Sequence, residues 1–250
     1  MLRIAHLVKQ FGGLRAVSDV SFDVVQGQIK AVIGPNGAGK TTIFNLITGV
    51  DAPTEGDIAF EGKRITGLKT HQIAALGLSR TFQNIQLFDH MSVLENVMVG
   101  RHTRTVSGML SAAFRLPKTR AEEKAIREAA MERLVFVGLD AQAGELAANL
   151  AFGGQRTLEF ARALATEPKL LLLDEPASGL NAHETIVLAE LILKIREQGV
   201  TVLLVEHDME LVMDISDEVA VLNYGKKIAD GKPEAVQNDE RVVAAYLGEA

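Results

Sequence analysis

A glycine-rich segment in the first quarter of the chain has the composition of a phosphate-binding loop. Two glycines frame the pattern G-x-x-x-x-G-K-T, which ends in a lysine and a threonine. Glycines let the backbone curl until several N–H groups point at phosphate oxygens, and the lysine adds a positive charge. We therefore predict that nucleotide phosphates bind at Gly34, Pro35, Asn36, Gly37, Ala38, Gly39, Lys40, Thr41 and Thr42.

Two carboxylates that follow an apolar run are candidates for magnesium binding and for activation of water. Residues 170–173 are all leucine, as expected for a strand buried on both faces of a parallel sheet. The next residue, Asp174, would then lie at the carboxyl edge of the sheet, where α/β proteins bind ligands. We expect Asp174 and the Thr41 hydroxyl to hold Mg²⁺, and Glu175 to polarise the attacking water.

A histidine and a glutamine follow two other predicted strands. His207 comes just after the apolar run of residues 200–205, so its imidazole could bond the γ-phosphate, although a lone histidine is more often structural. Gln83 follows a strand predicted over residues 78–82, and its amide oxygen could reach magnesium or the attacking water. An isolated glutamine has little functional significance, so its interpretation depends on the other residues.

The pattern of apolar residues predicts an α/β core with a helical insertion and no internal repeat. In the first third we expect strands over residues 2–8, 17–25, 28–33, 57–60 and 78–82, with helices over 41–47 and 70–76. Residues 92–164 read as helical, with a charged surface helix over 118–137 and a loop around 103–108. In the last third we expect strands over 170–173 and 200–205, a hairpin of 219–222 with 226–230, and helices over 182–198 and 241–247.

The composition excludes several classes of site. The formal charge of −6, from 26 basic and 32 acidic residues, disfavours nucleic acid as a partner. The absence of cysteine excludes disulfides, thiolate metal sites and a cysteine nucleophile. The densest apolar run is far shorter than the ~20 residues of a membrane-spanning helix, and the first residues do not resemble a signal peptide. We therefore expect any work at a membrane to be that of a peripheral protein.

Together these residues resemble the nucleotide-binding subunits of ATP-binding cassette (ABC) transporters. In that family's terms, residues 34–42 resemble the Walker A motif, Gln83 the Q-loop, residues 170–175 the Walker B motif with its catalytic glutamate, and His207 the H-loop. Phe11 stands where an aromatic ring stacks on adenine, although a core residue is the alternative. The D-loop is matched by Ser178, Gly179, Leu180 and Asn181.

The resemblance implies a fold, cofactors and partners. It implies a P-loop NTPase core, residues 1–86 and 165–250, with a mixed sheet and an N-terminal antiparallel β subdomain, and an inserted helical subdomain over residues 87–164. ATP and Mg²⁺ would be the cofactors. A second ABC ATPase subunit would complete the site, as a heterodimer or alternatively a homodimer. Two permease subunits, and indirectly a periplasmic substrate-binding protein, would place the chain on the cytoplasmic side of the inner membrane.

Four short segments narrow the resemblance to the LivG-type ATPases of branched-chain amino-acid importers: FGGL at 11–14, RTFQ at 80–83, EHDM at 206–209 and YLGEA at 246–250. Systems for urea, amides or lipopolysaccharide are the alternatives within transport. Soluble cassette ATPases of DNA repair usually carry coiled coils or zinc modules, which this sequence lacks. P-loop kinases and GTPases lack a signature helix between the glutamine and Walker B.

The family's signature, Leu-Ser-Gly-Gly-Gln, is altered here. The stretch reads Leu150, Ala151, Phe152, Gly153, Gly154 and Gln155. One register puts Phe152 at the serine position. The register that we prefer, counted back from residues 161–164, puts Ala151 there and Gly154 at the glutamine. Both lack the serine hydroxyl, so we expect backbone N–H groups and the helix N-terminus to contact the partner subunit's ATP.

Overall fold

The computed structural model describes residues 1–101 and 117–247, and the loop expected around residues 103–108 lies outside this part. The described chain forms two compact units. One comprises Met1–Arg80 and Lys169–Ala250, and the other comprises Thr81–Pro168. We call them the core unit and the helical unit and describe each by itself. The predicted α/β class is confirmed, and no helix in the described part is both long and apolar enough to cross a membrane.

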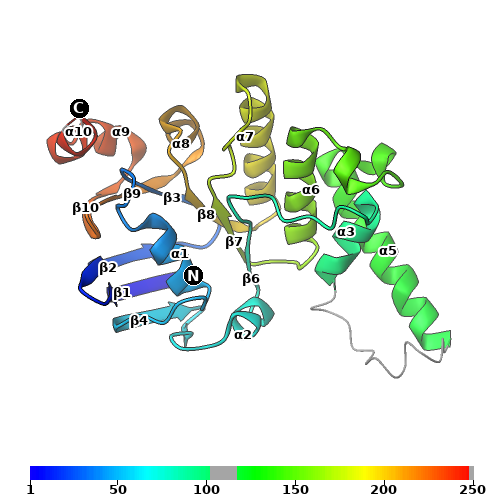
Figure 1. Cartoon of the computed structure of the whole chain (residues 1–250), viewed down its shortest axis with the longest axis horizontal. Helices are drawn as coiled ribbons and strands as arrows, with labels where there is room; N and C mark the ends of the chain where they lie inside the picture. Colours follow the sequence, from blue (N-terminus) through cyan, green and yellow to red (C-terminus); the bar gives the residue numbers. More distant parts are fainter. Residues whose placement is uncertain (102–116, 248–250) are drawn as a thin grey trace. The chain divides into compact units, whose positions relative to one another are not determined.

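The core unit begins with an antiparallel sheet in the order β2-β1-β4-β5 (Figure 1). Its strands are β1 (Leu2–Phe11), β2 (Leu14–Val24), β4 (Glu55–Phe60) and β5 (Lys63–Arg64). The first strand is three residues longer than predicted, because irregularities in its pairing with β2 interrupt the alternation that sequence patterns rely on. The short edge strand β5 was not predicted.

A second, six-stranded sheet has the order β10-β9-β3-β8-β7-β6. Five of its strands run parallel, and only β10 is antiparallel to its neighbour. Three are wholly buried, namely β3, β7 and β8. Burial was predicted for the latter two from their apolar runs. The strands are β3 (Ile29–Ile33), β6 (Leu78–Arg80), β7 (Leu170–Asp174), β8 (Thr201–Val205), β9 (Glu218–Asn223) and β10 (Lys226–Gly231).

Helix α1 (Lys40–Ile47) lies between the two sheets and joins them into one hydrophobic core. Its buried Ile43, Phe44 and Ile47 pack with apolar residues of both sheets. Two short helices near the carboxyl end, α8 and α9, were not predicted. The remaining helices of the core unit are α2 (Thr70–Ala75), α7 (Ala182–Glu197), α8 (Met209–Ile215), α9 (Pro233–Gln237) and α10 (Glu240–Leu247).

The helical unit is built from α3 (Val93–Gly100), α5 (Pro117–Val137) and α6 (Phe152–Leu164). These helices share an apolar core that includes Val97, Leu134 and Leu158. The prediction of helix throughout residues 92–164 was too simple, because two short 3₁₀ turns, Asp140–Gln142 and Ala147–Asn149, and irregular segments separate α5 from α6. The charged helix predicted over 118–137 is confirmed as α5.

Candidate functional site

The glycine-rich loop follows β3 and is shaped by close backbone approaches that exclude side chains. Gly34 has φ +151°, and a Cβ placed on it would lie 2.2 Å from the Leu222 carbonyl oxygen. Gly39 has φ +103°, and its Cβ would lie 2.6 Å from the Ala16 carbonyl oxygen. Since neither contact can accommodate a methyl group, both positions require glycine. The loop is thus held between β9 and β2 with its curvature fixed.

Lys40 and Thr41 open α1 directly after this loop. The Lys40 ammonium group donates to the carbonyl oxygens of Gly34, at 2.6 Å, and Pro35, at 2.9 Å. Its side chain is buried, whereas Thr41 is exposed. Gly39 is the N-cap of α1 and supplies no side-chain acceptor, so the first N–H groups of the helix are not capped by a side chain. Such a helix start favours an anion.

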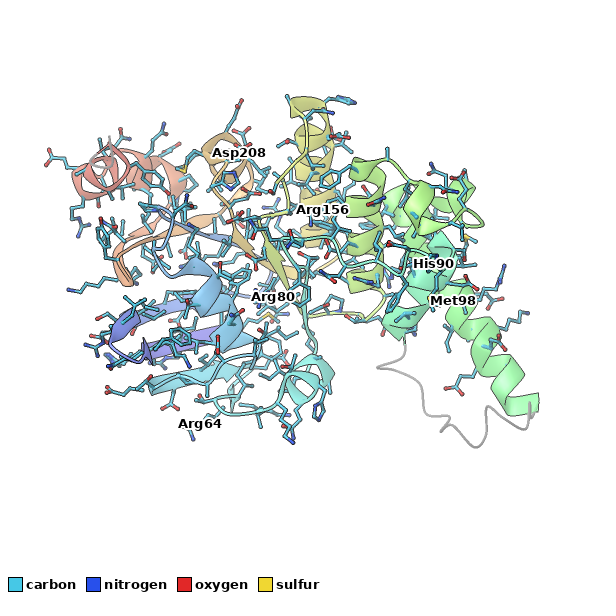
Figure 2. The ribbon with its side chains drawn as sticks, viewed as in Figure 1. Arg64, Arg80, His90, Met98, Arg156 and Asp208 are labelled. Carbon is cyan, nitrogen blue, oxygen red and sulfur yellow. The ribbon has the colours of Figure 1, made fainter. Side chains whose placement is uncertain are left out.

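Asp174 ends β7 on the same edge of the sheet. Because β3, β8 and β7 are adjacent and parallel, their carboxyl ends bring the loop, His207 and Asp174 to one edge. The Asp174 carboxylate accepts a hydrogen bond of 2.6 Å from the Arg80 guanidinium, and both side chains are buried. Arg80, which Figure 2 labels, also donates to the side-chain oxygens of Asn45 and Thr48. The sequence did not reveal this partner of Asp174.

Glu175 has an unusual backbone, with φ +47° in the left-handed region. A residue with a side chain rarely adopts this conformation, and such strain often occurs at functional sites. Its N–H donates to the Val205 carbonyl oxygen at 2.8 Å, which anchors it to β8. The Glu175 carboxylate lies 3.7 Å from His207 Nδ1, and the imidazole is largely exposed. The core unit therefore brings these two predicted residues together.

Glu206, which the sequence reasoning overlooked, connects the loops that carry these two residues. Its fully buried carboxylate accepts hydrogen bonds from the backbone N–H groups of Ala177, His207 and Asp208, at 2.8, 2.8 and 3.1 Å. Asp208 in turn caps α8 by accepting from the Leu211 N–H. In the sequence, Glu206 is only a charged residue at the end of an apolar strand. Such a residue can equally lie in an exposed turn, so its burial and its three hydrogen bonds could not be predicted.

Phe11 lies at the end of β1 with 45% of its surface exposed, so the alternative that it is a core residue is wrong. The Lys9 ammonium group lies 4.6 Å from the centre of its ring. An exposed aromatic face on the unit that carries the phosphate loop suits stacking on a base.

The segment predicted to be the D-loop leads from Glu175 into α7. The Ser178 N–H donates to the Glu175 carbonyl oxygen, and the Leu180 N–H donates to the Ala177 carbonyl oxygen. Asn181 caps α7, with its side chain accepting from the Glu184 N–H in a capping box. Gly179 has φ +82°, which suits glycine. The hydrogen bond from Ser178 thus links this segment directly to Glu175, the predicted catalytic residue.

Gln83 and the signature residues belong to the helical unit. Gln83 is exposed. It lies three residues beyond the end of β6, because that strand ends at Arg80 and not at residue 82 as predicted. The signature residues lead into α6, whose N-cap is Ala151 and which begins at Phe152. Ala151 offers no side-chain hydrogen bond to this helix start, as the missing serine predicted.

Gly154 of the signature has different surroundings from the glycines of the phosphate loop. Gly154 has an ordinary helical φ, and its Cβ would lie 3.4 Å from Leu150 Cβ, an ordinary contact. The Gln155 side chain donates to the Leu150 carbonyl oxygen at 3.1 Å. A side chain at Gly154 is therefore sterically acceptable, so packing does not require glycine there.

These residues fit a magnesium nucleotide better than a free metal ion. In the described part of the chain, no three histidine, aspartate or glutamate side chains form a group that could hold a metal by themselves. Magnesium usually binds one or two protein oxygens together with phosphate oxygens and water. The donor set of the Thr41 hydroxyl and the Asp174 carboxylate matches that requirement, with the phosphates supplied at the glycine-rich loop.

Comparison with known families agrees with this geometry. A family model described as "ABC transporter" matches residues 17–178, which include the glycine-rich loop, Gln83, the signature stretch and the two carboxylates at the end of β7. The chain belongs to the ABC transporter family. A second model, described as "Branched-chain amino acid ATP-binding cassette transporter", matches residues 226–250 of this ABC protein.

Relatives match the ABC chain over its full length. It is 47% identical to the high-affinity branched-chain amino acid transport ATP-binding protein BraF of Pseudomonas aeruginosa, over all of this chain and 98% of that protein. It is 45% identical to LivG of Escherichia coli, with the same coverage. Among solved structures, a nucleotide-free ATP-binding cassette from an ABC transporter has a TM-score of 0.86 and 33% identity, covering 98% of each chain. A cassette in its ADP conformation has the same TM-score and 32% identity, covering 99% of this chain and 98% of that one.

Proposed function

We propose that this ABC ATPase powers the import of branched-chain amino acids. Two observations support the substrate class. The family model for branched-chain amino acid transporters matches the carboxyl-terminal residues, and the full-length relatives named above are described as branched-chain amino acid transport proteins. The permease and binding-protein subunits, rather than this chain, would select the substrate.

The observation that carries the proposed ATPase mechanism is the convergence of charged and polar groups at one sheet edge. Lys40 and the loop N–H groups would neutralise the phosphates, while Thr41 and Asp174 would hold magnesium. Glu175 would orient the attacking water, and His207, beside it, would contact the γ-phosphate. Magnesium, when bound, would supply charge stabilisation at the transferred phosphoryl group. Phe11 would stack on adenine.

The helical unit would serve the nucleotide of a second subunit. The uncapped start of α6 at Ala151 and Phe152 offers backbone N–H groups to the partner's γ-phosphate. The Gln83 amide oxygen would reach the magnesium or the attacking water at the ATP of its own subunit, and residues 178–181 would line the dimer contact. In this arrangement ATP closes the dimer, and hydrolysis reopens it. We propose that residues 1–86 with 165–250 bind nucleotide and that residues 87–164 transmit its state.

The permease would bind near residues 87–90 of the helical unit. There the Phe88 ring is 46% exposed, although its backbone is fixed by hydrogen bonds to the Asn96 side chain. Asp89 and His90 beside it are exposed. An exposed ring on a rigid backbone suits contact with a membrane partner. The chain would then work peripherally on the cytoplasmic face of the membrane, with two permease subunits, a second cassette and, indirectly, a periplasmic binding protein.

Reconstitution tests this proposal. The full chain would be assembled with its cognate permeases, second cassette and binding protein in proteoliposomes, and ATP turnover measured with each substrate. We expect leucine, isoleucine or valine to raise turnover and to accumulate inside. Stimulation by urea or an amide, without any by these amino acids, would contradict the substrate class but not the ATPase mechanism.

A further inference from the structure

Two buried, oppositely charged side chains lie on α6 directly after the signature residues. Arg156 and Glu159 are each 2% exposed, and Arg156 Nη1 donates to Glu159 Oε2 at 2.8 Å. Figure 2 labels Arg156 on this helix. Charged residues are almost never fully buried unless they are paired, as these two are. The burial of such a pair still needs an explanation, because apolar residues would stabilise the helix without the cost of burying charge.

Both side chains hold the backbone that carries Gln83. Arg156 donates through Nη1 to the Phe82 carbonyl oxygen, at 3.0 Å, and through Nη2 to the Gln83 carbonyl oxygen, at 2.9 Å. Glu159 Oε1 accepts from the Phe82 N–H at 3.2 Å. Three hydrogen bonds thus join two consecutive residues to one helix. The planar guanidinium can serve both carbonyls together, which a lysine could not do.

Packing alone does not explain the pair. The neighbouring α6 residues Leu158 and Ala161 are part of the apolar core of the helical unit. Burial raises the pKa of Glu159, so keeping this carboxylate ionised at neutral pH costs stability. Replacing such a pair with apolar residues of similar volume is often neutral or stabilising. Residue Phe82 itself is 46% exposed, so its ring contributes little burial to hold the segment.

The pair also links two motifs that sequence analysis treated separately. The helix that contains Arg156 is the one whose uncapped start is formed by Ala151 and Phe152. Its regular hydrogen bonding continues from Phe152 to Leu164, so the signature residues and the pair form one rigid element. A shift of this helix start would therefore be transmitted to the Gln83 backbone through these hydrogen bonds.

We propose that Arg156 and Glu159 are positioning residues that fix Gln83 relative to the signature helix. Gln83 would contact the magnesium or the attacking water at the subunit's own ATP, and the helix start would bind the γ-phosphate of the partner's ATP. Both nucleotides then act on one rigid element. This inference rests on the proposed roles of Gln83 and the signature residues. It adds that this ion pair, which is buried within the helical unit, couples the effects of the two nucleotides on that unit.

The test replaces both charges at once, as Arg156→Met with Glu159→Leu, in the full chain. We expect the melting temperature to be unchanged or higher, because no charge is left unpaired. Amide hydrogen exchange at Phe82 should become about ten-fold faster or more, since its acceptor is lost. ATP affinity of the isolated subunit should stay within about two-fold. Turnover in the assembled transporter should fall by about ten-fold or more, because small displacements of positioned groups are costly.

A matched control changes an exposed pair in the same unit, Lys124→Met with Glu128→Leu. These side chains are 3.6 Å apart on α5 and mostly exposed, so neither exchange at Phe82 nor turnover should change. As a second variant, Arg156→Lys keeps the positive charge but loses the planar guanidinium that donates to two carbonyl oxygens at once. Its turnover should therefore lie between those of the wild type and the double variant.

Unchanged exchange at Phe82, or unchanged turnover while Gln83→Ala is impaired, would overturn the positioning role. If the double variant fails to fold, Arg156→Lys supplies the turnover readout alone, because it leaves the Glu159 acceptor of the Phe82 N–H in place. Wild-type turnover in Arg156→Lys, while Gln83→Ala is impaired, would overturn the role as well. Failure of the proposed function looks different, because wild-type protein itself would then lack turnover, while the exchange experiment requires no nucleotide.

Discussion

The buried contact between Arg80 and Asp174 gives a sharp test of the core unit. Changing Arg80 to leucine would leave the Asp174 carboxylate buried without its charged partner. It would also remove a donor from the side-chain oxygens of Asn45 and Thr48, at 2.9 and 3.3 Å. The side chains of the pair are only 7% and 6% exposed, so water cannot replace the guanidinium easily.

The expected loss is that of a broken buried pair, about 3–5 kcal/mol. An unfolding entropy of ~2.1 cal/mol/K per residue amounts to ~0.5 kcal/mol/K for this chain length, so the melting temperature should fall by about 6–10 °C. Urea denaturation and differential scanning calorimetry of the purified chain would measure both quantities. If Asp174 is also replaced, as Arg80→Leu with Asp174→Leu, most of this stability should return, because neither charge remains buried.

Arg64→Leu is the matched control. Arg64 Nε lies 2.5 Å from Asp57 Oδ1 in the same unit, but the two side chains are 70% and 59% exposed. Removing this arginine should cost less than about 1 kcal/mol. If Arg80→Leu is no more destabilising than Arg64→Leu, the reasoning that Asp174 depends on its buried partner is refuted.

Three further predictions concern other parts of the molecule. Glu206→Gln would place an amide NH₂ group against a backbone N–H donor such as that of Ala177. It should therefore lower the free energy of unfolding, measured by urea titration, by about 1–3 kcal/mol. A wild-type urea midpoint would contradict the role of Glu206 in joining the two loops. Gly154→Gln should alter the ATPase rate or nucleotide affinity of the assembled transporter; unchanged values of both would count against our signature register. Hydrogen bonds from the Arg241 side chain and backbone lower the pKa of Asp239 to about 2. The stabilising contribution of this carboxylate is present above its unfolded pKa of ~3.9 and is lost as the pH falls toward 2. NMR titration would measure that pKa, and a value near 3.9 would disprove the lowering; Asp239→Asn should abolish this pH dependence of stability.

Much of the fold could be predicted because its signals are local. The four leucines before Asp174 form a buried parallel strand, and the glycine spacing at residues 34–39 corresponds to backbone approaches that exclude a Cβ. Both features can be read from a short stretch of sequence, although the groups that approach the two glycines, the carbonyls of Leu222 and Ala16, lie far away along the chain. The short helices α8 and α9 were missed because seven and five residues carry too little periodicity to recognise.

The buried charged pairs could not be predicted. Arg80 lies 94 residues from Asp174, and Arg156 lies 73 residues from Gln83. A charged residue is normally assigned to the surface, and no local pattern reveals a partner so distant in sequence. The left-handed backbone of Glu175 was equally hidden, because tertiary contacts impose it against the preference of the residue.

The most direct test of the central claim is Glu175→Gln in the assembled transporter. The substitution keeps the size of the side chain and removes its ability to polarise water, while the phosphate loop and Lys40 are unchanged. We predict that ATP binding, measured with a fluorescent analogue, stays close to wild type while steady-state release of phosphate is lost. Phosphate release at the wild-type rate would contradict the account that this carboxylate, at the edge of the central sheet, drives hydrolysis.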